Sequence, residues 1–167
     1  MVKYMNGNLL ESGCDYICHQ VNCQGKMGSG IAKQIRDKWP IVYEQYIIGY
    51  EELKDDILRN CGSFEFAPDV SEVLLGRMQI VPIENDKSVV NMFSQQYYGY
   101  DGKRYTSYDA FVNCLDQIRR AVPHDKRIGF PYNIGCDRGG ASWNIISAMI
   151  EEILKDHTVE IWRLYND

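Results

Sequence analysis

The sequence predicts an α/β domain with helices on both faces of a mostly parallel sheet. Short apolar runs with the composition of strands alternate along the chain with longer segments that have the 3.6-residue period of helices. Two of the strand-to-helix transitions pass through glycine-rich turns, and no internal repeat or low-complexity segment interrupts the order. Such alternation is typical of a sheet that is covered by helices on each side.

Six strands are expected from short apolar runs that end at turn residues. The second of them has the character of a buried strand and runs directly into the first glycine turn. The third and fourth are separated by residues 84–87, Glu-Asn-Asp-Lys, which have the composition of a turn. In chain order, the six predicted strands span residues 2–5, 16–21, 78–83, 88–93, 127–131 and 159–164.

Apolar residues at helical spacing predict four helices. In the first, Ile31, Ile35 and Trp39 fall on one face, and Pro40 limits further continuation. Residues 51–72 have a poor pattern with scattered charges, so we expect a solvated surface segment without chemistry of its own. In chain order, the helices are expected over 30–38, 41–50, 106–121 with Thr106 as the N-cap, and the segment that Ser142 caps.

Composition and charge are those of one soluble globular domain, residues 1–167. Hydrophobic residues make up 45% of the chain and charged residues 25%. The net charge is −5 and the Lys and Arg residues are scattered, which argues against duplex nucleic acid as the main partner. No apolar run approaches the length of about 20 residues that a membrane helix needs, and the N-terminus lacks the apolar core of a signal peptide. We therefore expect a cytoplasmic protein with no membrane partner.

Six cysteines are present, and three of them, Cys14, Cys18 and Cys23, lie near His19 in the sequence. These residues do not form a Cys-x-x-Cys pair, and neighbours on a strand such as Cys18 and His19 point to opposite faces. A compact disulfide scaffold would be shorter and denser in cysteine. Reduced, mostly buried thiols are the favoured interpretation, and no metal site is expected.

The two glycine turns are the strongest functional signal. The first follows the strand at 16–21 and contains Gly25, Gly28 and Gly30; the second, residues 133–140, follows the strand at 127–131. In parallel sheets the ligand crevice lies beyond the carboxyl ends of the strands. Glycine lets a ligand approach main-chain N–H groups, and a helix N-terminus favours an anion. We therefore expect a phosphate-bearing ligand at these turns. The glycine spacing matches neither a P-loop nor Gly-x-Gly-x-x-Gly, so neither of these two nucleotide-binding motifs is indicated.

The motifs around these turns resemble those of the macrodomain family, which comprises ADP-ribose-binding modules. They are residues 19–32 (HQVNCQGKMGSGIA), preceded by Gly-Asn-Leu at 7–9, and residues 134–143 (IGCDRGGASW). More narrowly, the sequence resembles the branch that contains ADP-ribose 1″-phosphate phosphatases and terminal ADP-ribose protein glycohydrolases. The resemblance covers nearly the whole chain. It implies a three-layer α/β/α fold with a central mixed, mostly parallel sheet, and it implies no cofactor.

The resemblance also implies the ligand-binding residues. Asn8 occupies the position where many macrodomains carry an aspartate that accepts a hydrogen bond from adenine, and an amide oxygen can also accept it. Asn22 lies where the family orients the distal ribose. Independently of the resemblance, Lys26 either contacts a terminal phosphate or is a solvated loop lysine. Tyr165 is either an adenine-stacking residue or an exposed aromatic near a terminus. The predicted binding residues are Asn8, Leu9, Asn22, Lys26, Gly28, Ser29, Gly30, Ile31, Gly135, Cys136, Asp137, Arg138, Gly139, Gly140 and Tyr165.

The catalytic residues of the relatives are only partly matched. Glycohydrolases of this branch that form a lysine adduct place the lysine where this sequence has residues 94–96, Ser-Gln-Gln, and their aspartate aligns with Gly139. Asp137, two residues earlier, is either a general base or a turn residue. His19 occupies the position of a histidine in the phosphatases, and its alternative is a hydrogen-bonded histidine of the core.

These residues predict a protein that binds ADP-ribose and hydrolyses a derivative at the distal ribose, with ADP-ribose 1″-phosphate as the first substrate to test. Two alternatives remain open. One is a non-catalytic reader of ADP-ribose, and the other is a hydrolase that removes ADP-ribose from modified protein or nucleic acid. The expected partners are ADP-ribose or a derivative and ADP-ribosylated protein. Tyr97, Tyr98 and Tyr100 either cover the ribose or pack on their own domain.

Overall fold

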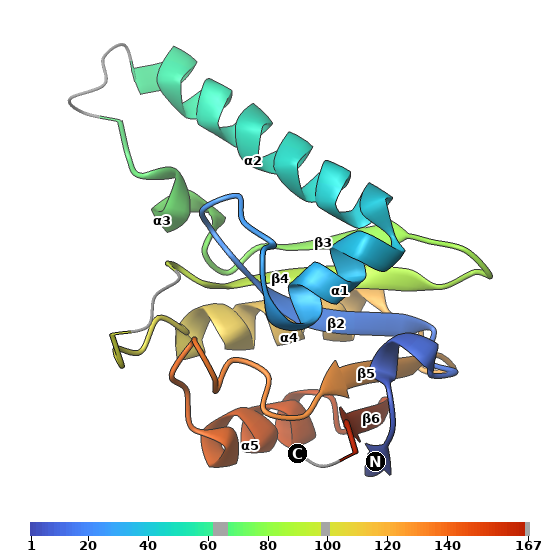
Figure 1. The fold of residues 1–167 in the computed structure, drawn as a ribbon. Coiled ribbons are helices and arrows are strands. Elements are labelled where there is room, and N and C mark those ends of the chain that lie inside the picture. Colours follow the sequence, from blue (N-terminus) through green and yellow to red (C-terminus); the bar gives the residue numbers. More distant parts are fainter. Residues whose placement is uncertain (62–66, 98–100, 166–167) are drawn as a thin grey trace.

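A computed structural model describes residues 1–61, 67–97 and 101–165 and contains a six-stranded sheet (Figure 1). The strand order is β1-β6-β5-β2-β4-β3; β3 is antiparallel to β4, and the other neighbouring pairs are parallel. The expected mixed, mostly parallel sheet is confirmed. The strands are β1 (Val2–Asn6), β2 (Tyr16–Asn22), β3 (Met78–Pro82), β4 (Ser88–Gln95), β5 (Arg127–Pro131) and β6 (Thr158–Arg163).

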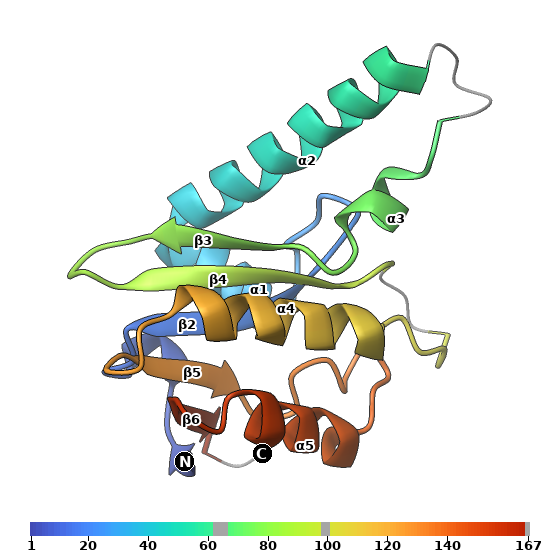
Figure 2. The same ribbon diagram turned by 180° about the vertical axis from the view of Figure 1, so that it is seen from behind.

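Helices on both faces of the sheet make three layers (Figures 1 and 2). The helices are α1 (Gly30–Lys38), α2 (Pro40–Cys61), α3 (Val70–Leu74), α4 (Tyr108–Ala121) and α5 (Trp143–Ile153), with a short 3-10 helix at Leu9–Glu11. β2 contributes to two cores, because its side chains alternate between the faces of the sheet. Cys18 joins the core beneath α4 and α5, whereas Ile17 and Val21 join the core beneath α1 and α2. In the described part of the chain, no helix is both long and apolar enough to cross a membrane.

Helix α2 is much longer than the segment 41–50 predicted from the sequence. It continues to Cys61, and α3 begins at Val70, so much of the stretch 51–72 that we expected to be a solvated segment is helical. The second half of α2 is helical because Leu53 and the buried Ile57 continue one apolar stripe along the helix. Two ion pairs at i,i+3 spacing involve the surrounding charged residues. Residues 62–66 lie outside the described residues.

The N-cap of α4 is one residue later than predicted. Ser107 is the cap, and its side chain accepts a hydrogen bond from the Ala110 N–H at 3.2 Å. Thr106, the expected cap, is instead buried and forms an isolated antiparallel bridge with Gln95. Ser142 is the N-cap of α5 as expected, although its side chain makes no capping hydrogen bond.

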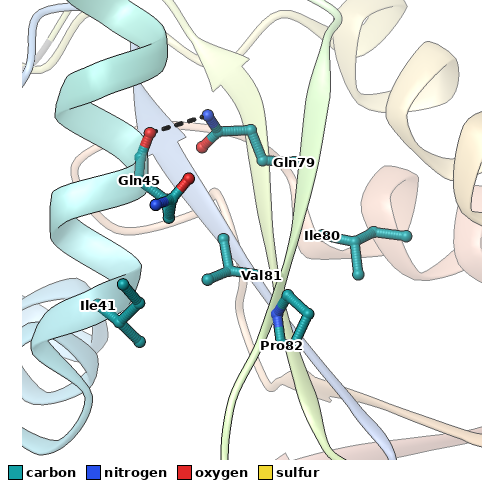
Figure 3. Close-up of a pocket in the computed structure, with 6 residues that line it drawn as sticks. All are labelled: Ile41, Gln45, Gln79, Ile80, Val81 and Pro82. Carbon is teal, nitrogen blue, oxygen red and sulfur yellow. Dashed lines mark hydrogen bonds between the residues drawn. The ribbon is translucent and has the colours of Figure 1, made fainter.

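A chain of polar side chains links the middle of the sheet to α2. His19 Nε2 lies 2.5 Å from Asn91 Oδ1, and Asn91 Nδ2 donates to Gln79 Oε1 at 3.2 Å. Gln79 then donates from Nε2 to the Gln45 carbonyl oxygen of α2 at 3.1 Å (Figure 3). A groove of about 400 Å³ lies at this junction of α2 and the outer strand β3. The chain of amides therefore joins the sheet to the long helix by hydrogen bonds as well as by apolar contact.

Candidate ligand-binding cleft

A cleft of about 990 Å³ lies beyond the carboxyl ends of the central parallel strands. Its lining includes residues of both glycine turns, which follow β2 and β5 in the chain (Figure 1). Residues 7–9, which follow β1, and residues 162–164, at the end of β6, also line the cleft. The predicted binding residues that line this cleft are Asn8, Leu9, Asn22, Lys26, Gly28, Ser29, Gly30, Ile31, Gly135, Asp137, Arg138 and Gly139.

The first glycine turn is anchored on one side and open on the other. Cys23 and Met27 are almost fully buried in the core beneath α1 and α2. Gly25 and Gly30 have φ values of 76° and 56°, in the left-handed region that favours glycine. A Cβ added at Gly28 or Gly30 would find no atom within 4 Å. The exposed glycines therefore leave the backbone accessible to a ligand in the cleft.

The Ser29 side chain is not available to cap α1. Ser29 is the N-cap residue, but its hydroxyl makes no capping hydrogen bond and instead accepts one from the Arg138 guanidinium. The first N–H groups of α1 are thus left without a side-chain acceptor, at the positive end of the helix dipole. The same contact bridges the two glycine turns and brings a permanent positive charge to the cleft. The arrangement suits an anionic ligand.

The second glycine turn is clamped against the segment that precedes α4. The N–H groups of Tyr105 and Thr106 both donate to the Gly139 carbonyl oxygen at 2.9 Å. The Thr106 hydroxyl donates to the Gly135 carbonyl oxygen at 2.9 Å, and Gln20 Nε2 donates to that hydroxyl at 2.9 Å. A Cβ at Gly139 would overlap the Thr106 hydroxyl and the Gly135 carbonyl oxygen. Glycine is therefore required at 139 by packing.

A neutral network occupies the position where the resembled hydrolases carry their lysine. Ser94 is fully buried, and its hydroxyl donates to Gln20 Oε1 at 2.8 Å. Gln20 donates in turn to Gln95 Oε1 at 3.0 Å, and Gln95 donates to the Tyr97 carbonyl oxygen at 2.7 Å. Gln20 and Gln95 both line the cleft. This part of the cleft presents amides and offers no charged nucleophile.

Asp137 is the one carboxylate among the described residues that line the cleft. It is exposed, and its own backbone carbonyl accepts a hydrogen bond from the Gly140 N–H at 3.2 Å, as in a turn. Within residues 1–61, 67–97 and 101–165, no group of three His, Cys, Asp or Glu side chains is arranged to hold a metal ion. Among these lining residues, a proton acceptor for hydrolysis can therefore be supplied by Asp137.

Curated relatives match over most of the chain at low identity. A DNA ADP-ribosyl glycohydrolase from Thermus aquaticus is 22% identical over 166 residues, which are 97% of this chain and 40% of the relative. A protein of the same name from Mycobacterium tuberculosis is 24% identical over 152 residues, which are 86% of this chain and 36% of the relative. The chain thus spans less than half the length of these relatives. No known protein-family model matches the chain.

Solved structures match the whole chain. A Bacteroides thetaiotaomicron protein of unknown function is 26% identical, with a TM-score of 0.78 and 98% coverage of both chains. The macrodomain of Mycobacterium tuberculosis DarG is 19% identical, with a TM-score of 0.75 and 97% coverage of both chains. Thermosipho africanus DarTG, solved in complex with ADP-ribose, is 16% identical, with a TM-score of 0.71; the match covers 96% of this chain and 41% of that one.

The chain has the macrodomain fold. His19 is a core residue in this structure, which is the alternative to a catalytic role that the sequence left open. Its side chain is fully buried, does not line the cleft, and is hydrogen-bonded to Asn91. Burial lowers the pKa of His19 to about 4, so the imidazole is neutral at physiological pH. Ile17 and Val21, two residues to either side on β2, are buried on the same face.

Three predicted binding residues are not part of the cleft lining. Tyr165 is 73% exposed, which corresponds to the alternative of an exposed aromatic near a terminus. Gly140 is exposed, and Cys136 is half-buried with its thiol 3.5 Å from the Ile134 carbonyl oxygen. Burial raises the pKa of Cys136 to about 11, so this thiol is protonated at neutral pH.

The aromatic loop after β4 is only partly described. Tyr98 and Tyr100 lie outside the described residues. The Tyr97 hydroxyl donates to Asp69, the N-cap residue of α3, at 3.1 Å, and Tyr97 does not line the cleft. Of the two predicted roles, covering the ribose or packing on its own domain, the contacts of Tyr97 correspond to the second.

Several cleft residues were missed by sequence reasoning. Tyr132 and Arg163, at the ends of β5 and β6, line the cleft, and the Arg163 guanidinium lies 3.8 Å from the centre of the Tyr132 ring. Trp162 also lines it, with Nε1 donating to the buried Glu160 at 2.9 Å. The rule that ligands bind beyond the carboxyl ends of parallel strands applies to these two strands as well and could have identified them.

Proposed function

We propose that this macrodomain binds ADP-ribose in the cleft and releases it from a modified substrate by hydrolysis at the distal ribose. The observation that carries the proposal is the pairing of two glycine turns across one cleft, bridged by Arg138 and Ser29. The diphosphate would meet the free N–H groups of α1 and the Arg138 guanidinium, which are both suited to negative charge. The ADP-ribose bound to the related Thermosipho africanus DarTG supports this assignment.

Asn8 is proposed for the adenine end of the ligand. Its Oδ1 accepts a hydrogen bond from the Leu10 N–H at 3.0 Å, which fixes the side chain as the cap of the short 3-10 helix. An amide oxygen has a second lone pair, which can accept a hydrogen bond from the adenine amino group. The neutral amide makes this bond weaker than the one that an aspartate would form.

Asp137 is proposed as the general base. In the hydrolysis, a water oxygen bonds to the anomeric carbon of the distal ribose and the bond from that carbon to the modified group breaks. One water proton goes to Asp137 and is later returned through solvent, while the leaving group takes up a proton. A lysine adduct is not proposed, because residues 94–96, Ser-Gln-Gln, occupy the place where the resembled glycohydrolases carry their lysine.

A nucleic-acid base is the proposed carrier of the ADP-ribosyl group. The curated relatives from Thermus aquaticus and Mycobacterium tuberculosis are named DNA ADP-ribosyl glycohydrolases, which supports this choice. Hydrolysis of ADP-ribose 1″-phosphate is the weaker alternative, because it was motivated by His19 and that residue is buried outside the cleft. The non-catalytic reader is favoured by one observation, the absence of the lysine from residues 94–96 and of the aspartate from position 139.

The test combines calorimetric titration of ADP-ribose with release assays on ADP-ribosylated single-stranded DNA, ADP-ribosylated protein and ADP-ribose 1″-phosphate. We expect binding, release from DNA, and an Asp137→Asn variant that binds ADP-ribose normally but releases it about 100-fold or more slowly. Asp125→Asn is the matched control, since Asp125 is an exposed carboxylate in the turn that leads into β5, away from the cleft.

Three results would change the conclusion. Binding without release from any of the three substrates would establish a reader and remove the hydrolase. Equal release rates in wild type and Asp137→Asn would exclude Asp137 as the base. No detectable binding of ADP-ribose to folded protein would overturn the proposed function altogether.

A further inference from the structure

The hydroxyl of Tyr46, a residue of α2, contacts the first glycine turn from inside the core. Its oxygen lies 2.8 Å from the Asn22 carbonyl oxygen and 3.0 Å from Asn22 Oδ1, and it accepts a hydrogen bond from the Lys26 N–H at 3.0 Å. The single hydroxyl proton is donated to Asn22. One buried side chain thus joins both ends of the five-residue segment 22–26.

Tyr46 itself is held rigidly. It has no exposed surface, and its ring stacks on Phe93 of β4 with ring centres 5.6 Å apart. Burial raises the pKa of the Tyr46 hydroxyl, so it stays protonated and remains a donor at neutral pH. Gly25 packs on the same helix, because a Cβ there would lie 3.6 Å from Ile47 and 3.7 Å from Tyr50. The first glycine turn therefore packs directly on helix α2.

The Asn22 side chain is used within the turn. Its Nδ2 donates to the Lys26 carbonyl oxygen at 2.8 Å, and its Oδ1 accepts from the Gln24 N–H at 3.0 Å. Together with the Tyr46 hydroxyl, these bonds define the path of the chain from the end of β2 to Lys26. Gly28, Ser29 and Gly30, which line the cleft, follow directly.

We infer that Tyr46 is a positioning residue for ADP-ribose binding, which acts through Asn22 and the Lys26 amide to place the main-chain groups of residues 28–30. The inference rests on the proposed function. The loss of the hydroxyl leaves Asn22 Oδ1 with one partner fewer and the Lys26 amide without its closest acceptor. The turn then samples other conformations, and ordering it on binding reduces the affinity for the ligand.

The test measures ADP-ribose and AMP affinity for wild type, Tyr46→Phe and Tyr43→Phe. Tyr43 is the matched control, since it is a tyrosine on the same helix whose ring lies 6.2 Å from that of Tyr46 but is not adjacent to the turn. We expect Tyr46→Phe to weaken ADP-ribose binding about five- to tenfold. AMP lacks the distal ribose and one of the two phosphates that this turn is proposed to bind, so its affinity should change less than twofold. Tyr43→Phe should bind both ligands as wild type does.

A thermodynamic cycle with Asn22→Ala tests whether Tyr46 acts through Asn22. The Kd of the double variant should be no more than about twice that of Asn22→Ala alone, because both substitutions break the same hydrogen-bonded group of Tyr46 and Asn22. Full multiplication of the two losses would show independent roles and contradict the inference. So would an equal loss of ADP-ribose and AMP affinity, which indicates general destabilisation.

A hydrogen-exchange measurement on wild type gives a second criterion that does not depend on the folding of a variant. The Lys26 amide should be protected despite the exposure of the Lys26 side chain. A freely exchanging amide would overturn the inference. If wild type fails to bind ADP-ribose, the proposed function fails; if it binds and Tyr46→Phe binds equally well, only this inference fails.

Discussion

Gly139→Ala is the substitution that most directly tests how the second glycine turn is built. Gly139 aligns with the catalytic aspartate of related hydrolases, yet a Cβ at this position would overlap the Thr106 hydroxyl and the Gly135 carbonyl oxygen, and it would lie 2.9 Å from Gln20 Nε2. One of the overlapping atoms belongs to the backbone and another to a short side chain. Neither can move aside without breaking hydrogen bonds, so we expect the variant to be strongly destabilised.

The magnitude follows from two contributions. Forcing an extra methyl group into a packed region costs about 1–3 kcal/mol of unfolding free energy. The displaced Thr106 hydroxyl bridges Gln20 and the Gly135 carbonyl oxygen, and losing one of these hydrogen bonds costs about 1 kcal/mol more. Gly139→Ala should therefore lower the unfolding free energy by about 2–4 kcal/mol.

Chemical denaturation of Gly139→Ala and of Gly28→Ala provides the measurement and its control. Gly28 also lines the cleft, but it has no positive φ and a Cβ there would find no atom within 4 Å. Gly28→Ala should unfold within about 0.5 kcal/mol of wild type and bind ADP-ribose less tightly, because its methyl group enters the cleft. If Gly139→Ala unfolded at the wild-type denaturant concentration, the packing explanation for the missing aspartate would be refuted.

Two further predictions concern stability alone. The folded protein holds His19 with a pKa of about 4 against 6.5 when unfolded, so the unfolded state binds the proton first and stability is lost as the pH falls from 6.5 toward 4. Between pH 7 and 4.5, wild type should lose about 2–3 kcal/mol more than His19→Gln, and parallel pH profiles of unfolding would contradict this. Ser107→Ala should cost about 1 kcal/mol because the Ser107 hydroxyl caps α4. Ser29→Ala should cost less, because the Ser29 hydroxyl makes no capping hydrogen bond and loses only its contact with Arg138; equal midpoints in denaturant would show otherwise.

Element boundaries could be predicted where the chain carries local punctuation. Helix α1 spans Gly30–Lys38 as expected, because Gly30 precedes its apolar stripe and Pro40 follows it. The end of α2 could not be predicted in the same way. Charged residues dominate its second half, and the apolar stripe that continues through Leu53 and Ile57 is recognisable as such only when the core beneath it is known.

The two catalytic candidates show what sequence position can and cannot establish. His19 matches a motif position, but motif position does not state which face of a strand a side chain occupies. Its neighbours Ile17 and Val21 at i−2 and i+2 are both apolar, and this alternation was a signal that the residue points into the core. Asp137 is on a turn, where no such periodicity constrains the side chain, and the structure brings it to the cleft.

Under the proposed function, binding and catalysis would depend on different parts of the chain, and the sequence predicts the binding part more readily than the catalytic part. The anion seat is built from main-chain N–H groups and glycine geometry, which persist when surrounding side chains change. The lysine mechanism of the resembled hydrolases depends on single side chains. At both of its positions, residues 94–96 and Gly139, this chain has residues that are held by hydrogen bonds or close packing. Ser94 donates within a buried amide network, and a lysine there would bring a charge into it at a cost in desolvation. A side chain at Gly139 would overlap its neighbours, and Asp137 is the one carboxylate among the described residues that line the cleft, which is why we propose Asp137 as the base.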